Sequence, residues 1–367
     1  MLVLIIANNA QGLLSFRREL VERLIGDYEV AFCVPEGFED ACVKELVSLG
    51  ASHVQCRHLS RRGTNPTEDL QLLLFYVRLI KQIRPSVVLT YTIKPNVYGG
   101  IACTVCKVPY IANVTGLGTA VEHGGALQTL TLSLYKLGLK HAAKVFFQNA
   151  SNRDFMLSNN VVTTASDLLP GSGVNTVKFA LSDYPNGTDE CRFITVGRIM
   201  RDKGIGELLK AAAIIRKQYP NAKFRLLGSF DESWEAEVSK AVSEGIVEYV
   251  PQQLDVRPYV AESHAIVHPS WHEGMSNVCL EAASMGRPII ASNIPGCRET
   301  FEDNVTGIGF EAKDADSLAN ALKRFIDLPY EKKIQMGLAG REKVVREFDR
   351  QIVINKYLDE ISAIVKE

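Results

Sequence analysis

The chain has 367 residues, and its 41 Lys and Arg nearly balance its 42 Asp and Glu. This length exceeds the range in which one hydrophobic core keeps growing, so we expect two domains; an apolar content of 46% is ordinary for a globular protein. The eight cysteines have no framework spacing, which argues against a disulfide-stapled secreted protein and favours reduced thiols in the cytoplasm.

The first half of the chain alternates between apolar strands and helical segments. The opening run LVLIIA follows Met1 directly, without a signal peptide, and is far too short to span a bilayer, so it is predicted to be a strand. Hydrophobic periodicity predicts further strands at 28–34, 53–59, 86–92, 108–114 and 144–149, and helices at 13–26, 39–49, 69–84 and 126–142.

The periodicity lapses over residues 171–190, where Gly, Pro, Asn and Asp favour a linker. The alternation then resumes, with strands predicted at 192–199, 222–229, 246–250, 264–270, 288–292 and 305–310 and helices at 203–218, 233–243, 255–263 and 276–286.

Apolar strands that alternate with helices indicate parallel sheets covered on both faces. We therefore predict an α/β protein of two Rossmann-like, doubly wound domains that face each other across a cleft. The first domain is expected at residues 1–170 and the second at 191–349, with a C-terminal helix at 350–367 that packs back on the first domain.

Charge is distributed unevenly along the chain. Residues 1–170 contain 16 Lys and Arg against 13 acids, and residues 70–153 contain nine against one, Glu122. This bias suggests an anionic partner for the first domain, although solvated helix faces would give the same counts. The predicted helices 69–84 and 126–142 are apolar on one face and basic at their ends, which suits an anionic membrane surface or a lipid diphosphate; ordinary core helices with basic rims are the alternative.

Ligands of open α/β sheets bind beyond the carboxyl ends of the strands. Gly12 follows the first strand and is expected just before a helix, where a glycine lets the backbone approach a ligand and the helix end favours an anion. In VGRIMRDKG, Gly197 and Arg198 end a strand and Lys203 begins a helix. Two cations at that junction suit a diphosphate, although both could be ordinary surface charges.

A second group of candidates lies in HPSWHEGMSNVCLEAASMG, where Glu273 precedes a predicted helix and Glu281 lies inside it. The backbone amides at the start of this helix could hold a phosphate, and two flanking carboxylates could accept hydrogen bonds from sugar hydroxyls. This pattern favours a nucleotide sugar. The residues expected to supply the amides are Gly274, Met275, Ser276 and Asn277.

The paired carboxylates fit a metal site or a glycosidase less well. A metal site would need more ligands than His268 and His272 provide, and His268 at the end of an apolar strand is more often a satisfied histidine than a ligand. A glycosidase with two carboxylates would need no diphosphate pocket. We therefore expect no metal and no cofactor, with the nucleotide sugar acting as a substrate.

VGRIMRDKG, the Glu-x7-Glu of EGMSNVCLE and PGCRE (295–299) resemble the second domain of the family 4 glycosyltransferases. YTIKPNVYG (91–99) and NVTGLGTA (113–120) are similar to bacterial members that build capsule, O-antigen and lipid-linked oligosaccharides. The resemblance covers almost the whole chain. It implies a retaining, metal-independent enzyme of the GT-B fold that transfers a hexose or N-acetylhexosamine, most often from UDP, to a glycan or polyprenyl-diphosphate-linked acceptor.

The resemblance also implies roles for single residues. Arg198 and Lys203 would stabilise the departing diphosphate, and Glu281 would hold the nucleotide ribose. Glu273 and the amides that follow it would hold the donor sugar and its phosphate, and Gly12 would let the first domain approach the donor. No nucleic acid is expected as a partner. The enzyme is expected in the cytoplasm, with peripheral attachment to the inner face of the cell membrane as a further hypothesis.

The first domain departs from the family at one position. Many members have a histidine after the fifth strand, whereas this chain has Thr115 and Gly116 there. His123 could take that place by folding back, although an ordinary loop histidine is the simpler interpretation. A retaining transfer needs no base if the acceptor proton passes to the leaving phosphate. Acceptor or other first-domain contacts are expected from Lys94, Asn113, Thr115, Gly116 and His123.

Two alternative functions stay open from the sequence alone. A UDP-N-acetylglucosamine 2-epimerase shares the fold and the diphosphate site, but it would need acid and base side chains for which the first domain offers no clear pair. A non-catalytic homologue could bind the nucleotide sugar as a scaffold, and the presence of Arg198, Lys203, Glu273 and Glu281 argues against it.

Overall fold

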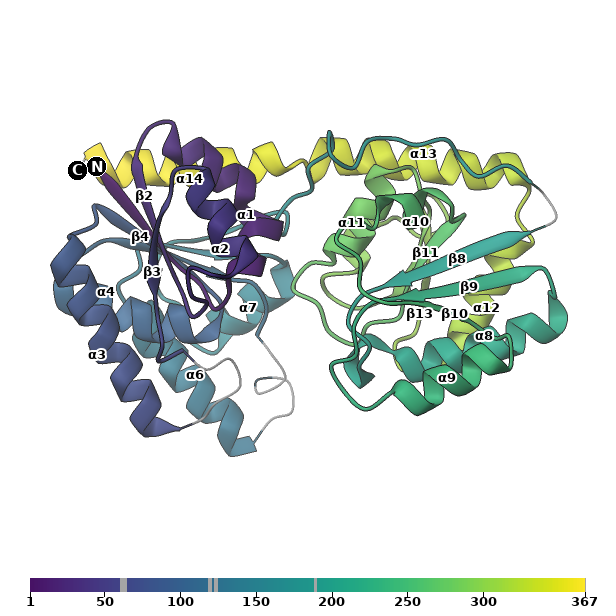
Figure 1. Cartoon of the computed structure of the whole chain (residues 1–367), viewed down its shortest axis with the longest axis horizontal. Coiled ribbons are helices and arrows are strands. Elements are labelled where there is room, and N and C mark those ends of the chain that lie inside the picture. The colour runs from purple at the N-terminus through teal and green to yellow at the C-terminus, as the bar shows by residue number, and fades with distance from the viewer. Residues whose placement is uncertain (60–64, 118–120, 122–124, 188–189, 367) are drawn as a thin grey trace. The chain divides into compact units, whose positions relative to one another are not determined.

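The computed structural model of the chain describes residues 1–59, 65–117, 121, 125–187 and 190–366. Its contacts divide the chain into two compact units, the first formed by Met1–Ser172 with Gln351–Glu367 and the second by Gly173–Arg350. Each unit is a parallel sheet with helices on both faces (Figure 1). The prediction of two doubly wound α/β domains is therefore confirmed.

The first unit contains a seven-stranded sheet in the order β3-β2-β1-β4-β5-β6-β7, and its registered strand pairs are all parallel. The order reverses beside β1, which is the doubly wound pattern. The strands are β1 (Leu2–Ile6), β2 (Glu29–Val34), β3 (Ser52–Gln55), β4 (Val87–Tyr91), β5 (Tyr110–Val114), β6 (Lys144–Phe147) and β7 (Ser166–Leu168).

Helices cover both faces of this sheet because the direction of winding changes after β3. One apolar layer contains residues of α1 (Ala10–Ile25), α2 (Ala41–Ser48) and α14 (Arg350–Lys366). The opposite layer contains residues of α3 (Pro66–Ile83), the π-helical turn Pro95–Gly99, α4 (Gly100–Cys106), α6 (Gly125–Leu139) and α7 (Ala150–Ser158). None of the described helices is both long and apolar enough to cross a membrane.

The C-terminal helix α14 belongs to the first unit, far in sequence from the rest of it. Tyr357 is fully buried among residues of β1, β4 and α1, and its ring meets Phe146 edge-on at 5.0 Å between centroids. The Asn113 side-chain amide donates to the Tyr357 hydroxyl at 2.7 Å. This helix therefore completes one of the two apolar layers of the first unit.

The second unit contains a six-stranded parallel sheet in the order β10-β9-β8-β11-β12-β13. Its strands are β8 (Cys191–Val196), β9 (Ala222–Leu227), β10 (Glu248–Val250), β11 (Ala265–His268), β12 (Ile289–Ser292) and β13 (Gly307–Phe310). The helices α8 (Ile205–Gln218), α9 (Glu235–Ser243) and α12 (Ala315–Ile326) pack on one face; α10 (Arg257–Ala261), α11 (Asn277–Ser284) and α13 (Tyr330–Glu347) pack on the other (Figure 1).

The burial of Tyr357 gives a test of how α14 is held. Replacing Tyr357 with Ala removes a buried ring and the partner of Asn113, so we expect the first unit to lose about 3 to 5 kcal/mol of unfolding free energy. Urea unfolding followed by circular dichroism measures this. Asp359→Ala, at an exposed position of the same helix, is the matched control and should change little. Equal effects of the two changes would contradict the packing described.

Candidate active site

Lys203 and Glu273, 70 residues apart in sequence, meet beyond the carboxyl ends of two neighbouring strands. Lys203 lies in the 3-10 turn Arg201–Lys203 that follows β8, and Glu273 lies in the loop that follows β11. Because β8 and β11 are paired, both loops leave the same edge of the sheet. The Lys203 Nζ donates to Glu273 Oε1 at 2.5 Å.

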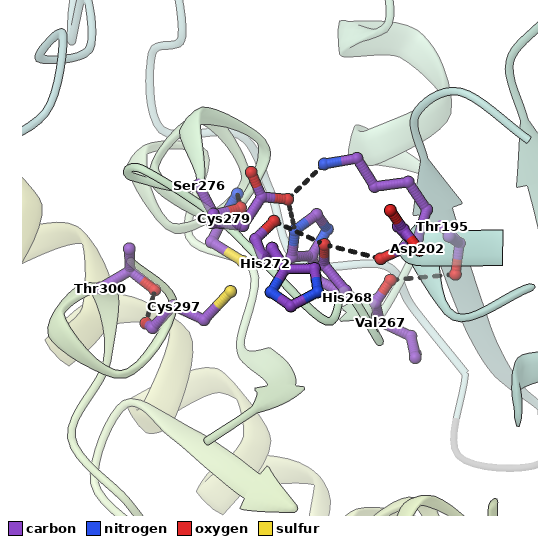
Figure 2. Close-up of polar contacts among 12 residues, drawn as sticks. Thr195, Asp202, Val267, His268, His272, Ser276, Cys279, Cys297 and Thr300 are labelled. Carbon is purple, nitrogen blue, oxygen red and sulfur yellow. Dashed lines mark hydrogen bonds and ion pairs between the residues drawn. The ribbon is translucent and has the colours of Figure 1, made fainter. Parts of the chain in front are cut away.

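His268 joins this pair. The Nε2 of His268, which is labelled in Figure 2, lies 2.8 Å from the same oxygen of Glu273. The His268 side chain is only 5% exposed. Burial of Glu273 opposes ionisation, but attraction to Lys203 and the hydrogen bond and charge of His268 together outweigh it and hold the pKa of Glu273 well below its usual range. The carboxylate is therefore ionised at neutral pH and fixed by two partners.

The two loops pack so closely that a glycine is required between them. Gly204 has a φ of +68°, and a Cβ at this position would lie 2.0 Å from the carbonyl oxygen of Pro269. The backbone N–H of Trp271 donates to the Asp202 carbonyl at 2.8 Å, which is a second contact between the two loops. These contacts fix the position of Lys203 relative to Glu273. The helix predicted at 203–218 includes Lys203 and Gly204, whereas α8 begins at Ile205.

The loop after Glu273 leads into α11, whose N-cap is Ser276 (Figure 2). The Ser276 hydroxyl accepts from the Cys279 N–H at 3.3 Å, and the Ser276 N–H donates to the Gly296 carbonyl at 2.7 Å. The prediction that this amide is aimed at a ligand is therefore wrong, because Gly296 already occupies it. Gly274 and Met275 lie in the loop just before the cap.

Two polar groups on one face of α11 are left for a ligand. Asn277 and Glu281 are one turn apart, and the Asn277 Oδ1 is buried without a hydrogen-bond partner in the described chain. No described side chain makes a hydrogen bond or an ion pair with the Glu281 carboxyl group, and burial raises its pKa to about 7 although Arg350 and Lys178 act in the opposite direction. Such acceptors suit hydroxyl or amide donors.

Arg198 lies outside this cluster. Its guanidinium Nη1 pairs with Asp231 Oδ2 at 2.5 Å, and its side chain is 41% exposed. The structure thus brings Lys203 and Glu273 together and directs Arg198 to a different carboxylate. Asp231 was missed from the sequence, although it follows β9 and could have been found by the rule applied to the other strand ends. Gly197 before it has a φ of +154°.

Residues predicted to act from the first unit are already engaged. Lys94 pairs with Asp69 at 2.7 Å, and the buried Asn113 donates to Tyr357. Gly12 lies inside the first turn of α1, where its N–H donates to Asn9 Oδ1, so the prediction that it precedes the helix is wrong.

Three further predictions concern Thr115 and Gly116 after β5, the loop residue His123, and catalysis without a metal. Thr115 and Gly116 follow β5 and are partly buried, and His123 lies outside the described residues. No group of three or more His, Cys, Asp or Glu that could hold a metal ion occurs among the residues the structure describes. Catalysis without a metal stays a prediction.

Comparison with known proteins identifies related sequences. Residues 190–327 match the family model of the "Glycosyl transferases group 1", and residues 40–149 match that of the "Glycosyl transferase 4-like" proteins. The chain is 25% identical over 317 residues to the capsular polysaccharide biosynthesis glycosyltransferase CapM of Staphylococcus aureus, with 82% of each chain covered. It is 28% identical over 193 residues to the amylovoran biosynthesis glycosyltransferase AmsK of Erwinia amylovora, with 49% of this chain and 46% of that one covered.

Solved structures share the fold. A glycosyltransferase from Rickettsia africae has a TM-score of 0.77 at 19% identity, covering 100% of this chain and 99% of its own. HepE from Anabaena, in complex with UDP and glucose, has a TM-score of 0.80 at 15% identity, covering 99% of this chain and 100% of its own. At these identities the likeness establishes the fold alone, and it confirms the predicted GT-B class.

The raised pKa of Glu281 gives a test of its surroundings. Since the pKa is about 7 in the folded chain against 4.5 for an ordinary glutamate, folding favours the protonated form, and the stability of the fold falls as pH rises from 4.5 through 7. Glu281→Gln should therefore stabilise the ligand-free protein by up to about 3 kcal/mol at pH 8 and far less at pH 4.5. Urea unfolding at both pH values measures the difference.

The control for the loss of one charge is Glu237→Gln, at an exposed position of α9. If the stability of Glu281→Gln relative to the natural chain did not change with pH, Glu281 would not be the buried, unpartnered acid described above.

Proposed function

We propose that this chain is a retaining glycosyltransferase that moves a hexose or N-acetylhexosamine from a UDP-sugar, which the matches of residues 190–327 and 40–149 to two glycosyl transferase family models support. The proposed acceptor is a lipid-linked saccharide precursor of a bacterial surface polysaccharide. Support for this role comes from CapM and AmsK, which are glycosyltransferases of capsular polysaccharide and amylovoran biosynthesis. Support for UDP comes from HepE, which was crystallised with it.

The observation that carries the proposal is the pairing of Lys203 with Glu273 beside the start of α11. The ion pair places a cation and an acceptor carboxylate at the edge of the sheet where ligands of this fold class bind. One N–H of the Lys203 ammonium goes to Glu273, and the group can direct its other two to phosphate oxygens. Glu281 and Asn277 lie on the adjacent helix and can accept from the ribose hydroxyls.

In the proposed reaction, the bond between the sugar C1 and the diphosphate oxygen breaks while the acceptor oxygen bonds to C1 from the same face. The acceptor hydroxyl proton passes to the leaving phosphate, so no side chain need act as a base. Lys203 stabilises the charge that develops on the diphosphate, together with Arg198 if it exchanges Asp231 for phosphate. Glu273 orients Lys203 and accepts from a donor sugar hydroxyl.

The remaining predicted residues would bind the donor without taking part in bond changes. The backbone of Gly274 and Met275 lies before the positive end of α11, where a phosphate is favoured. Gly197 and Gly12 are proposed to let the backbone approach the donor. The cap of α11 by Ser276 serves this site indirectly, because it fixes the helix that presents Asn277 and Glu281.

Removing the Lys203 ammonium tests the proposed site. Lys203→Ala should lower the rate constant of UDP-sugar turnover about 100-fold or more, because one preorganised charge on the leaving group is lost. Release of UDP from UDP-glucose or UDP-N-acetylglucosamine, with and without an acceptor, measures this. Lys217→Ala, which removes an exposed cation from α8, is the matched control.

Two results of that assay would contradict the proposal. Full activity of the Lys203→Ala protein would show that Lys203 does not stabilise the leaving diphosphate. Formation of an epimerised nucleotide sugar in the absence of any acceptor would point to an epimerase instead of a transferase.

We propose that the face of the first unit formed by α3 and α6 binds the membrane that contains the lipid-linked acceptor. On α6, Leu127, Leu130 and Leu137 are 50%, 56% and 58% exposed, and with the partly buried Leu134 they form one stripe. On α3, exposed Leu70 and Leu74 are followed on the same face by Arg78 and Lys81. Both helices lie on the same side of the sheet (Figure 1).

Exposed leucines next to basic residues favour an anionic bilayer, into which the leucines insert while the cations remain at the phosphates. The neighbouring cations are Lys136 on α6 and Lys140 just after its end, which are both exposed. The same surface would bring the enzyme to a lipid-linked acceptor.

Flotation with lipid vesicles tests this surface. The chain should float with vesicles that contain phosphatidylglycerol at low salt and should be released by high salt, because the electrostatic part of the attraction is screened. Replacing Leu127, Leu130 and Leu137 with Ser should abolish flotation without changing UDP binding. Leu254→Ser, at a fully exposed position of the second unit, is the control. Absence of flotation at low salt would refute membrane attachment.

A further inference from the structure

A cavity of about 380 Å³ lies at the amino-terminal edge of the second unit's sheet, at the opposite end of β8 from Lys203. It is lined by the starts of β8, β9 and β10 and by Ser263, just before β11. Its volume lies within the range of small-molecule sites. The charged residues that line it are the cations Arg192, Arg216, Lys223 and Arg225 and the acids Glu190 and Glu248.

The shortness of α10 accounts for the opening in this part of the sheet. The helix has only five residues, Arg257–Ala261, and the layer to which it belongs packs on Ile194 and Leu227, nearer the carboxyl ends of β8 and β9. Alternate residues of a strand lie on the same face of the sheet. Arg192, two residues before Ile194, and Lys223, four residues before Leu227, therefore lie on this face but nearer the starts of β8 and β9. Charged side chains therefore occupy the uncovered half of the face.

Two of the four cations are already neutralised or anchored. Arg225 forms ion pairs with Glu248 at 2.9 Å and with Glu262 at 2.8 Å, so its charge is already neutralised. The Arg216 Nη1 donates to the Ala222 carbonyl at 3.0 Å.

Arg192 and Lys223 remain, and they are direct partners in the register of β8 and β9. Neither makes an ion pair within the part of the chain that the structure describes, and Glu190 stands exposed at the rim. Adjacent strands are about 4.8 Å apart, so two like charges in register repel each other.

The environment of Arg192 indicates a missing partner. Its Nε is buried without a hydrogen-bond acceptor in the described chain, although a buried guanidinium N–H normally has one. Its backbone N–H donates to Nδ1 of His264, and burial together with the charges of Arg192, Lys333 and Arg287 lowers the pKa of His264 to about 4. His264 is therefore neutral at physiological pH and adds no positive charge, and neither Arg192 nor Lys223 has an ion-pair partner among the described residues.

We propose that this cavity is a second ligand site, which binds a small phosphorylated anion through Arg192 and Lys223. A phosphate would supply the acceptor that Arg192 Nε lacks and would neutralise the like-charged pair. The source could be free inorganic phosphate or the phosphate group of a sugar phosphate, for which the apolar part of the cavity wall leaves room. The site is separate from Lys203 and Glu273 and does not depend on the function proposed for them.

Isothermal titration of the full chain with inorganic phosphate and with glucose 6-phosphate, at low ionic strength, tests the proposal. We expect saturable binding of at least one probe that Arg192→Gln and Lys223→Gln each weaken about tenfold or more, the loss expected for one charge-assisted hydrogen bond. A tighter binding of glucose 6-phosphate would identify a sugar phosphate, and equal binding of both would identify the phosphate group alone. Lys203→Ala, on the opposite edge, should leave the part of the binding that depends on Arg192 and Lys223 unchanged.

Thermal unfolding without any added anion separates binding from folding. Arg192→Gln should unfold at an equal or higher temperature than the natural chain, because it removes repulsion with Lys223. The proposal is overturned if neither probe binds, if both substitutions leave binding unchanged, or if Lys203→Ala abolishes binding as strongly as Arg192→Gln. It is also overturned if Arg192→Gln lowers the unfolding temperature as a structural residue would.

Discussion

The ion pair between Lys203 and Glu273 is the interaction on which the active site depends. It joins the loop after β8 to the loop after β11, and both loops can approach only because residue 204 is a glycine with a left-handed backbone. The His268 Nε2–H donates to the same carboxylate oxygen at the end of β11. A buried carboxylate is costly unless it is paired, so this arrangement fixes both the charge and the position of the groups that meet a donor.

The helix α11 contributes the other half of the site. Its N-cap is Ser276, whose backbone N–H donates to the Gly296 carbonyl, so the helix starts at a fixed point next to Glu273. Asn277 and Glu281 then project from one face without hydrogen-bond partners in the described protein. The site therefore combines one satisfied carboxylate, which orients a lysine, with one unsatisfied carboxylate, which is free to accept hydroxyl groups. A nucleotide sugar offers both a diphosphate and hydroxyls.

Most strands and helices of the fold could be predicted from the sequence, because apolar strands and amphipathic helices are local patterns. The three-residue strand β7 was missed because it is only partly buried and has no apolar run. The start of α1 was placed three residues late because Asn9 caps the helix before its apolar stripe begins. Lys203 and Glu273 are both expected at one donor site, and the structure brings them together. The pairing of Arg198 with Asp231 is not expected, because it depends on which strands are neighbours in the sheet, and one sequence does not reveal that order.

Lys203 and Glu281 are proposed to hold the two ends of a nucleoside diphosphate, and a crystal structure of the chain with a UDP-sugar tests this most directly. We expect a diphosphate oxygen about 3 Å from Lys203 Nζ and the ribose hydroxyls on the Glu281 carboxylate. A nucleotide bound elsewhere, with Lys203 contacting only Glu273 and with Glu281 unoccupied, would contradict the proposed site.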